Sequence, residues 1–338
     1  MEENKRQISY EELKFTAPIG LEPVRPKKPA GLGRVLLFFL IVMAGFLVFG
    51  SLLQYYLGMG GVVLTELLFL VASLLFVRTQ KEDFRRVFPV RRPKLLALGG
   101  TAVLWLGSYL LIMVVTLIQA YFFPAVIYGE SGAINTTVQS IPWGISFLIV
   151  AVVPAICEEA MHRGVIQYGV QNTLGKTWQI VLVMGIFFGC FHLSLWKFLP
   201  TAVMGAVMSY ILLKTGNMVY SSFLHFLHNG LQMLLLLSVP GTVLQTEISL
   251  TAWEDYAPAV RLLPLSIGIY LCIAALVPYL FYLGNWMLKR AACGHKLPFF
   301  PKGKESVYFR RILILTAVLL AAGGTVLSAG VLSLISVY

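Results

Sequence analysis

Residues 35–56 read VLLFFLIVMAGFLVFGSLLQYY, with no charged side chain among them. A helix needs about 20 apolar residues to cross the hydrocarbon core of a bilayer, so this stretch predicts a membrane-spanning helix. Eight further apolar stretches follow it along the chain. With the first, their approximate bounds are 35–56, 59–77, 95–119, 142–168, 178–197, 199–213, 217–239, 262–287 and 312–336.

The composition supports the same interpretation. Of the 338 residues, 58% are hydrophobic and only 12% are charged, whereas soluble domains have about 45–50% and about 25%. This excludes a monomeric soluble enzyme, a disordered chain and a disulfide-rich scaffold. The four cysteines form no CxxC pair, so we expect no disulfide and no cysteine-rich metal site. We predict an all-α fold, a polytopic transmembrane helical bundle of about nine spans in the cell membrane.

The basic residues predict how the bundle is oriented. Segments 1–34, 78–94 and 289–311 each hold seven Lys or Arg residues, and with nine spans all three lie on one side. Only Lys197 and Arg261 fall on the other side. Because cytoplasmic loops are enriched in Lys and Arg, we expect a cytoplasmic N-terminus and an external C-terminus. The sixth span, 199–213, is short, which predicts a tilted, partial or protein-shielded segment.

The same pattern divides the chain into four parts. We predict a basic, flexible cytoplasmic tail at 1–33, a transmembrane bundle at 34–290, a basic cytoplasmic loop at 291–311 and an additional C-terminal span at 312–338. The net charge of +11 gathers beside the spans, where it attracts anionic membrane lipids. No nucleic-acid-binding module accompanies it, so we expect no nucleic-acid partner.

The fourth span carries charges that a lipid environment disfavours. Residues 157–164 read CEEAMHRG. Residues four apart on a helix are neighbours, so Glu159 and Arg163 share one face and Glu158 and His162 share another. Arg163 can then hold Glu159 as an anion, which leaves Glu158 to point into the bundle as a candidate general base. Taken alone, the set also fits an interfacial ion pair at the end of a helix.

Two later spans also carry polar side chains at membrane depth. The fifth contains His192, and the seventh contains His225 and Asn229 on one helical face, with His228 beside them. Such groups are costly unless they converge on one another or on water. We therefore expect Glu158, His192, His225 and Asn229 to meet in one cavity. Glu66, in the second span, could pair with a polar neighbour or contribute to folding, and we do not include it among the site residues.

These residues resemble the motifs of the CAAX-processing and bacteriocin-processing (CPBP, or Abi) family of intramembrane glutamic endopeptidases. The resemblance covers about residues 95–240, which we expect to be the catalytic core, and the family fold is a bundle of about eight helices. The chain is also similar to the type II CAAX prenyl protease. The three motifs occur in the family order as Glu158-Glu159-x-x-x-Arg163, Phe188-x-x-x-His192 and His225-x-x-x-Asn229.

The resemblance implies a mechanism and a class of substrate. Glu158 and His192 would activate a water molecule, and His225 and Asn229 would form an oxyanion hole. Glu159 and Arg163 would support them. The substrate would be a peptide or protein that is lipid-modified or membrane-associated, such as a prenylated CAAX protein or a bacteriocin. The family was long labelled metalloprotease, but we favour the glutamate-dependent mechanism and expect no cofactor.

Three alternatives stay open at this point. Zinc could bind Glu158, His192 and His225 with an open position for water, although Asn229 on the same face as His225 favours an amide donor over a metal ligand. The chain could also be a non-catalytic bacteriocin-immunity or membrane scaffold protein. Degraded motifs would favour that alternative, but all residues of the three motifs are intact here. A transporter could use the intramembrane acids as a proton relay, but the sequence lacks the internal repeat that many transporters have.

Overall fold

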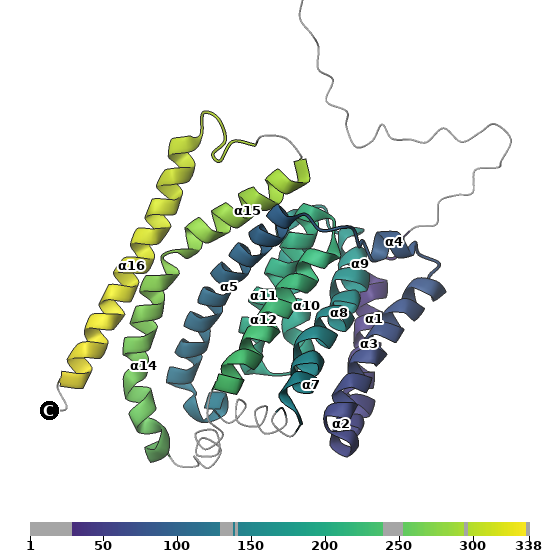
Figure 1. The fold of residues 1–338 in the computed structure, drawn as a ribbon, viewed down its shortest axis with the longest axis horizontal. Coiled ribbons are helices and arrows are strands. Elements are labelled where there is room, and N and C mark those ends of the chain that lie inside the picture. Colours follow the sequence, from purple (N-terminus) through teal and green to yellow (C-terminus); the bar gives the residue numbers. More distant parts are fainter. Residues whose placement is uncertain (1–28, 129–137, 139–140, 239–252, 294–296, 336–338) are drawn as a thin grey trace, which may run out of the picture.

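The computed structural model describes residues 29–128, 138, 141–238, 253–293 and 297–335 (Figure 1). Within these ranges every regular element is a helix and no strand occurs, which confirms the predicted all-α bundle. The predicted N-terminal tail lies almost entirely outside the described residues. The elements, in chain order, are α1 (Leu32–Gly45), η1 (Phe46–Gly50), α2 (Ser51–Leu57), α3 (Met59–Thr79), α4 (Phe84–Val87), α5 (Leu95–Phe122), α7 (Trp143–Phe147), η2 (Leu148–Val152), α8 (Val153–Glu159), η3 (Ala160–Ile166), α9 (Gln167–Gln171), α10 (Thr177–Phe191), α11 (Leu195–Thr215), α12 (Met218–Ser238), α14 (Trp253–Ala274), α15 (Val277–Cys293) and α16 (Glu305–Ile335).

Seven helical runs among the described residues are long and apolar enough to cross a membrane. The chain is therefore a multi-pass membrane protein, and each of the nine predicted stretches contains helix. The seven runs are Leu32–Leu57, Met59–Thr79, Leu95–Phe122, Trp143–Gln171, Leu195–Thr215, Val260–Cys293 and Glu305–Ile335. Helix α10 is a shorter apolar helix of 15 residues.

The sixth predicted stretch is longer than the sequence suggested. Helix α11 has 21 residues, because the Ser194 side chain accepts a hydrogen bond from the Lys197 amide and starts the helix earlier. Pro200 lies within this helix and has no N–H for the carbonyl of Trp196, four residues back. The Gln119 amide of α5 donates to that carbonyl at 3.1 Å. A neighbouring helix thus satisfies the group that the proline leaves free.

The eighth predicted stretch, 262–287, is two helices and not one. Helix α14 ends at Ala274 and α15 begins at Val277, since Pro278 lacks an N–H and its ring disfavours a continuous helix. At this break the hydroxyl of Thr316, in α16, donates to the Ala275 carbonyl at 3.2 Å. The additional C-terminal span is therefore joined to the bundle where the preceding span breaks.

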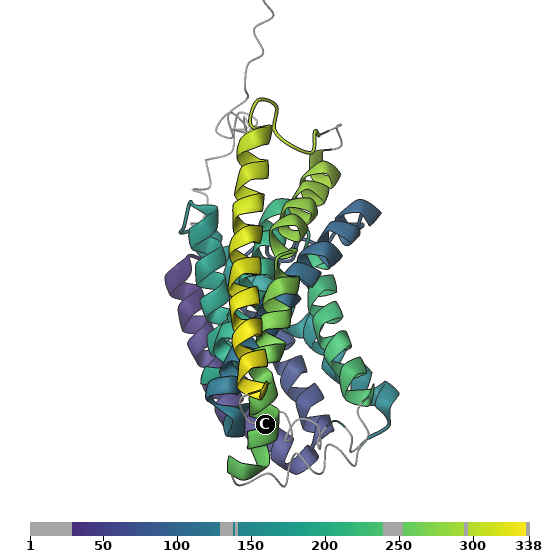
Figure 2. The ribbon, with the colours of Figure 1, turned by 90° about the vertical axis from the view of Figure 1, so that its left-hand side faces the viewer.

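Helix α16 and the helices α1 to α3 lie at opposite edges of the bundle (Figure 1). Figure 2 shows α16 standing along most of the height of the molecule. The central helices approach closely where one of them has glycine. A Cβ atom at Gly185 would lie 2.8 Å from the Ala202 carbonyl, so α10 and α11 could not be this close with a larger residue there. This contact places the end of α10, with Phe188, beside η3 and His225 of α12.

Candidate functional site

Glu158 and Glu159 end α8, and the next turn, η3, is a π-helix that carries Arg163. All three side chains are buried. The ion pair expected from the spacing is present, with Arg163 Nη1 and Glu159 Oε1 2.8 Å apart. A π-type turn often marks a functional site, because it changes which side chains face the neighbouring helices.

Arg163 is held from three sides inside the protein. Besides the ion pair, its Nη2 donates to the Gly205 carbonyl of α11 at 3.1 Å. Its guanidinium carbon lies 4.5 Å from the centre of the Phe188 ring of α10, a cation–π contact. Arg163 therefore connects α8, α10 and α11, and fixes the position of the Glu159 carboxylate between them.

His225, in α12, lies between the two glutamates. Its Nδ1 is 3.2 Å from Glu159 Oε1, and its Nε2 is 3.9 Å from Glu158 Oε2. We assign the Nδ1 proton as a donor to Glu159, because Arg163 also pairs with that oxygen and favours its charged form. Nε2 then faces Glu158, at a distance too long for a direct hydrogen bond. Contacts therefore run in order through Arg163, Glu159, His225 and Glu158.

Glu66, in α3, is the site neighbour that sequence reasoning left without a role. Its carboxyl group lies near that of Glu158, within reach of a hydrogen bond, and both residues are buried. Two carboxyl groups can share a hydrogen bond only when one of them carries a proton. The signal was present in the sequence, since an ionisable residue inside a span is a functional candidate by default.

His192 follows the last residue of α10, where its Nδ1 lies 2.9 Å from the Phe188 carbonyl. If Nδ1 donates there, Nε2 is left as an acceptor that can serve as a base. The rings of His192 and His225 lie 5.0 and 5.7 Å from that of Phe188. No hydrogen bond or ion pair of the described residues joins His192 to Glu158. The water-activating couple of these two side chains stays a prediction.

Asn229 lies one turn beyond His225 in α12. Its Nδ2 donates to the Val150 carbonyl at 3.0 Å. Val150 is four residues before Pro154, so its carbonyl has no α-helical N–H partner. Asn229 thus satisfies a group that the proline frees, which ties α12 to the helix of the two glutamates. Nδ2 carries two hydrogens, and this bond uses one of them.

The two remaining candidate histidines have structural surroundings. His162 Nδ1 lies 3.0 Å from the Glu158 carbonyl. Its ring packs edge-on against Phe188 and Phe191 at 4.9 and 4.8 Å. The His228 ring lies 6.1 Å from that of Tyr109. Among the described residues, no group of three or more His, Cys, Asp or Glu side chains is spaced to hold a metal ion. Glu158, His192 and His225, the candidate zinc ligands, therefore do not form such a group here.

Comparison with known proteins finds a match over the part of the chain that holds the site. Residues 139–231 match the Rce1-like family model, described as type II CAAX prenyl endopeptidase Rce1-like. The segment contains all three motifs, so the predicted resemblance is confirmed there. The matched family is one of endopeptidases, which supports peptidase activity at the level of the family. No curated protein and no solved structure matches the chain.

Proposed function

We propose that this chain is an intramembrane endopeptidase that uses Glu158 as its general base. The observation that carries the proposal is the series of buried contacts from Arg163 through Glu159 and His225 to Glu158. Charged side chains at this depth are costly, and here they meet from α8, η3 and α12 in one place. The match to an endopeptidase family over the same residues supports this function.

In the proposed reaction, Glu158 and His192 take a proton from water as its oxygen bonds to the carbonyl carbon of the substrate. The carbon–nitrogen bond then breaks, and the proton passes to the leaving nitrogen. The second N–H of Asn229 donates to the developing oxyanion, and His225 donates beside it from Nε2 when that nitrogen also carries a proton. Glu159 and Arg163 orient His225. We assign Glu66 as a positioning residue, which would hold the Glu158 carboxyl through a hydrogen bond between the two neighbouring carboxyl groups.

The substrate we propose is a membrane-associated or lipid-modified peptide, because the site is surrounded by membrane helices. The direct test is hydrolysis of a quenched fluorescent peptide by the full chain in lipid vesicles. A farnesylated CAAX peptide and its unmodified counterpart form one pair of substrates, and an apolar bacteriocin-like peptide is a third. Hydrolysis of any of them supports the proposal. The proposal would be contradicted if correctly folded protein cleaved none of these three peptides. The same protein would also have to leave the membrane proteins of its own cell uncleaved.

Metal independence is a separate prediction. We expect a zinc chelator to leave the rate of hydrolysis unchanged, because the proposed base and donors are all side chains. The measurement is the initial rate with and without chelator, together with the zinc content of the purified protein. Stoichiometric zinc, with activity lost to chelator and restored by zinc, would replace this mechanism by the zinc-dependent version of the same protease.

In the proposed orientation, the N-terminus and the basic loop 291–311 face the cytoplasm. In a variant without other cysteines, a thiol in place of Tyr56 should react with an impermeant reagent added to intact cells. Tyr56 lies near the end of α2 and is 75% exposed. The native Cys293, exposed at the end of α15, should react only after the membrane is permeabilised. The opposite pattern would reverse the orientation.

A further inference from the structure

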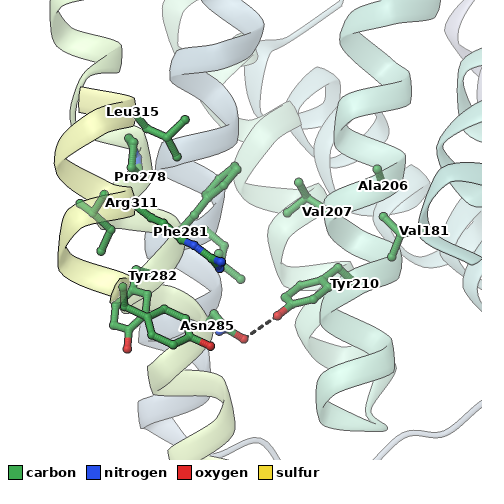
Figure 3. A pocket seen from close by; sticks show the side chains of 13 residues that line it. Val181, Ala206, Val207, Tyr210, Pro278, Phe281, Tyr282, Asn285, Arg311 and Leu315 are labelled. Atoms are coloured by element: carbon green, nitrogen blue, oxygen red, sulfur yellow. Dashed lines mark hydrogen bonds between the residues drawn. The ribbon is translucent and has the colours of Figure 1, made fainter. Parts of the chain in front are cut away.

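A large cavity lies away from the proposed catalytic residues. It has a volume of about 480 Å³ and opens between α16 on one side and α10 and α11 on the other, with α5 and α15 behind it (Figure 3). Most of its lining is apolar, including Val181, Val207 and Phe281. None of the residues assigned to hydrolysis lines it, so any ligand of this cavity would bind at a site separate from the catalytic one.

The lining is polar at one end and apolar at the other. On three helices a polar lining residue and a less polar one are four positions apart, which is about one helical turn. Figure 3 shows Tyr282 and Asn285 at one end and Leu315 and Pro278 at the other. The three pairs are Tyr210 with Ala206 on α11, Tyr282 with Pro278 on α15, and Arg311 with Leu315 on α16.

In each pair the polar residue is the one nearer to the basic loop 291–311. Helices α11 and α15 run toward that side of the membrane, and α16 starts from it. With the orientation proposed above, the polar end of the cavity lies toward the membrane surface and its apolar end toward the hydrocarbon region. This is the polarity of a lipid that belongs to the leaflet beside the basic loop.

Arg311 is the charged residue of the lining, and no acidic residue accompanies it there. Its guanidinium points from α16 into the cavity (Figure 3). The Tyr210 hydroxyl hydrogen-bonds to Asn285 Oδ1, which leaves the Asn285 amide nitrogen as a donor. A cation with neutral donors beside it suits a phosphate group, because guanidinium and phosphate form charge-assisted hydrogen bonds.

We propose that this cavity binds one anionic phospholipid, with its phosphate on Arg311 and an acyl chain along Leu315, Pro278 and Ala206. The inference is independent of the hydrolytic function. A basic pocket between membrane helices is a known arrangement for anionic headgroups. Helix α16 joins the bundle chiefly through α14, so a lipid here would also link its basic end to α11.

The test measures lipid adducts on the full chain by native mass spectrometry, with phosphatidylglycerol and phosphatidylcholine offered in turn. We expect one tightly retained phosphatidylglycerol and weaker retention of phosphatidylcholine. Arg311→Ala should weaken phosphatidylglycerol binding about fivefold, the effect of one charge near the surface. Arg310→Ala is the matched control, since Arg310 is the exposed neighbour outside the lining. Equal weakening by both variants, or equal retention of both lipids, would overturn the proposal.

A second pair of variants tests the acyl-chain end without changing charge. Leu315→Trp places a larger ring in the cavity and should lower the occupancy of phosphatidylglycerol. Leu313→Trp should leave it at the wild-type level, because Leu313 lies on the same helix outside the lining and is 43% exposed. If the two tryptophan variants bind the lipid alike, the cavity does not hold its acyl chain.

Discussion

Replacing Glu158 by Gln is expected to lower the rate of peptide hydrolysis by at least about 100-fold, because the amide keeps the shape but cannot accept a proton from water. The measurement is the initial rate of peptide cleavage by the full chain in vesicles. Glu82→Gln is the matched control. Glu82 accepts hydrogen bonds from the Ala30 amide and the Tyr168 hydroxyl. Neither of these partners belongs to the proposed catalytic site. It should keep the wild-type rate.

Glu66 offers the comparison that identifies the base. Glu66→Gln retains a hydrogen-bond partner for Glu158, so we expect a smaller loss than in Glu158→Gln. A positioning role would also change the pH dependence of the rate, since the proton shared by the two carboxyls is replaced by an amide proton. An equal or larger loss in Glu66→Gln would mean that Glu66 is the base, or that the two carboxyls act as one unit.

Local spacing was sufficient to predict part of this site. Arg163 is one turn after Glu159, and helical geometry alone places the two side chains together. The apolar stretches were predictable for a similar reason, because membrane helices must form their backbone hydrogen bonds internally. Spacing also shows which carbonyls Pro154 and Pro200 leave free. In both cases the partner, Asn229 or Gln119, comes from another helix and could not be predicted.

The contacts between distant helices needed the structure. Glu66 and Glu158 belong to α3 and α8, and no periodicity within either helix indicates that they meet. The π-type turn after Glu159 is equally absent from the sequence pattern, although it determines how Arg163 faces Phe188 and Gly205. Helices α14 and α15 break near Pro278, yet together they form the single apolar run Val260–Cys293, in agreement with the one span predicted there.

Arg163→Met is expected to destabilise the protein by about 3–5 kcal/mol, because it leaves the Glu159 carboxylate buried without its cation. Both side chains of the pair are 0% exposed, so water cannot replace the lost partner. The measurement is the free energy of unfolding in mixed micelles as the fraction of denaturing detergent rises. Arg163→Met also removes the hydrogen bond to Gly205 and the contact with Phe188.

The double variant Glu159→Gln with Arg163→Met separates these contributions. It lacks the same Gly205 and Phe188 contacts as the single variant but leaves no unpaired carboxylate at position 159. The amide oxygen introduced by Glu159→Gln can still accept the hydrogen bond from His225 Nδ1. We expect it to recover most of the lost stability, since replacing both members of a buried ion pair costs far less than removing one. If the double variant is no more stable than Arg163→Met, the loss comes from the arginine's contacts with α10 and α11, and Glu159 is not held as an anion by Arg163.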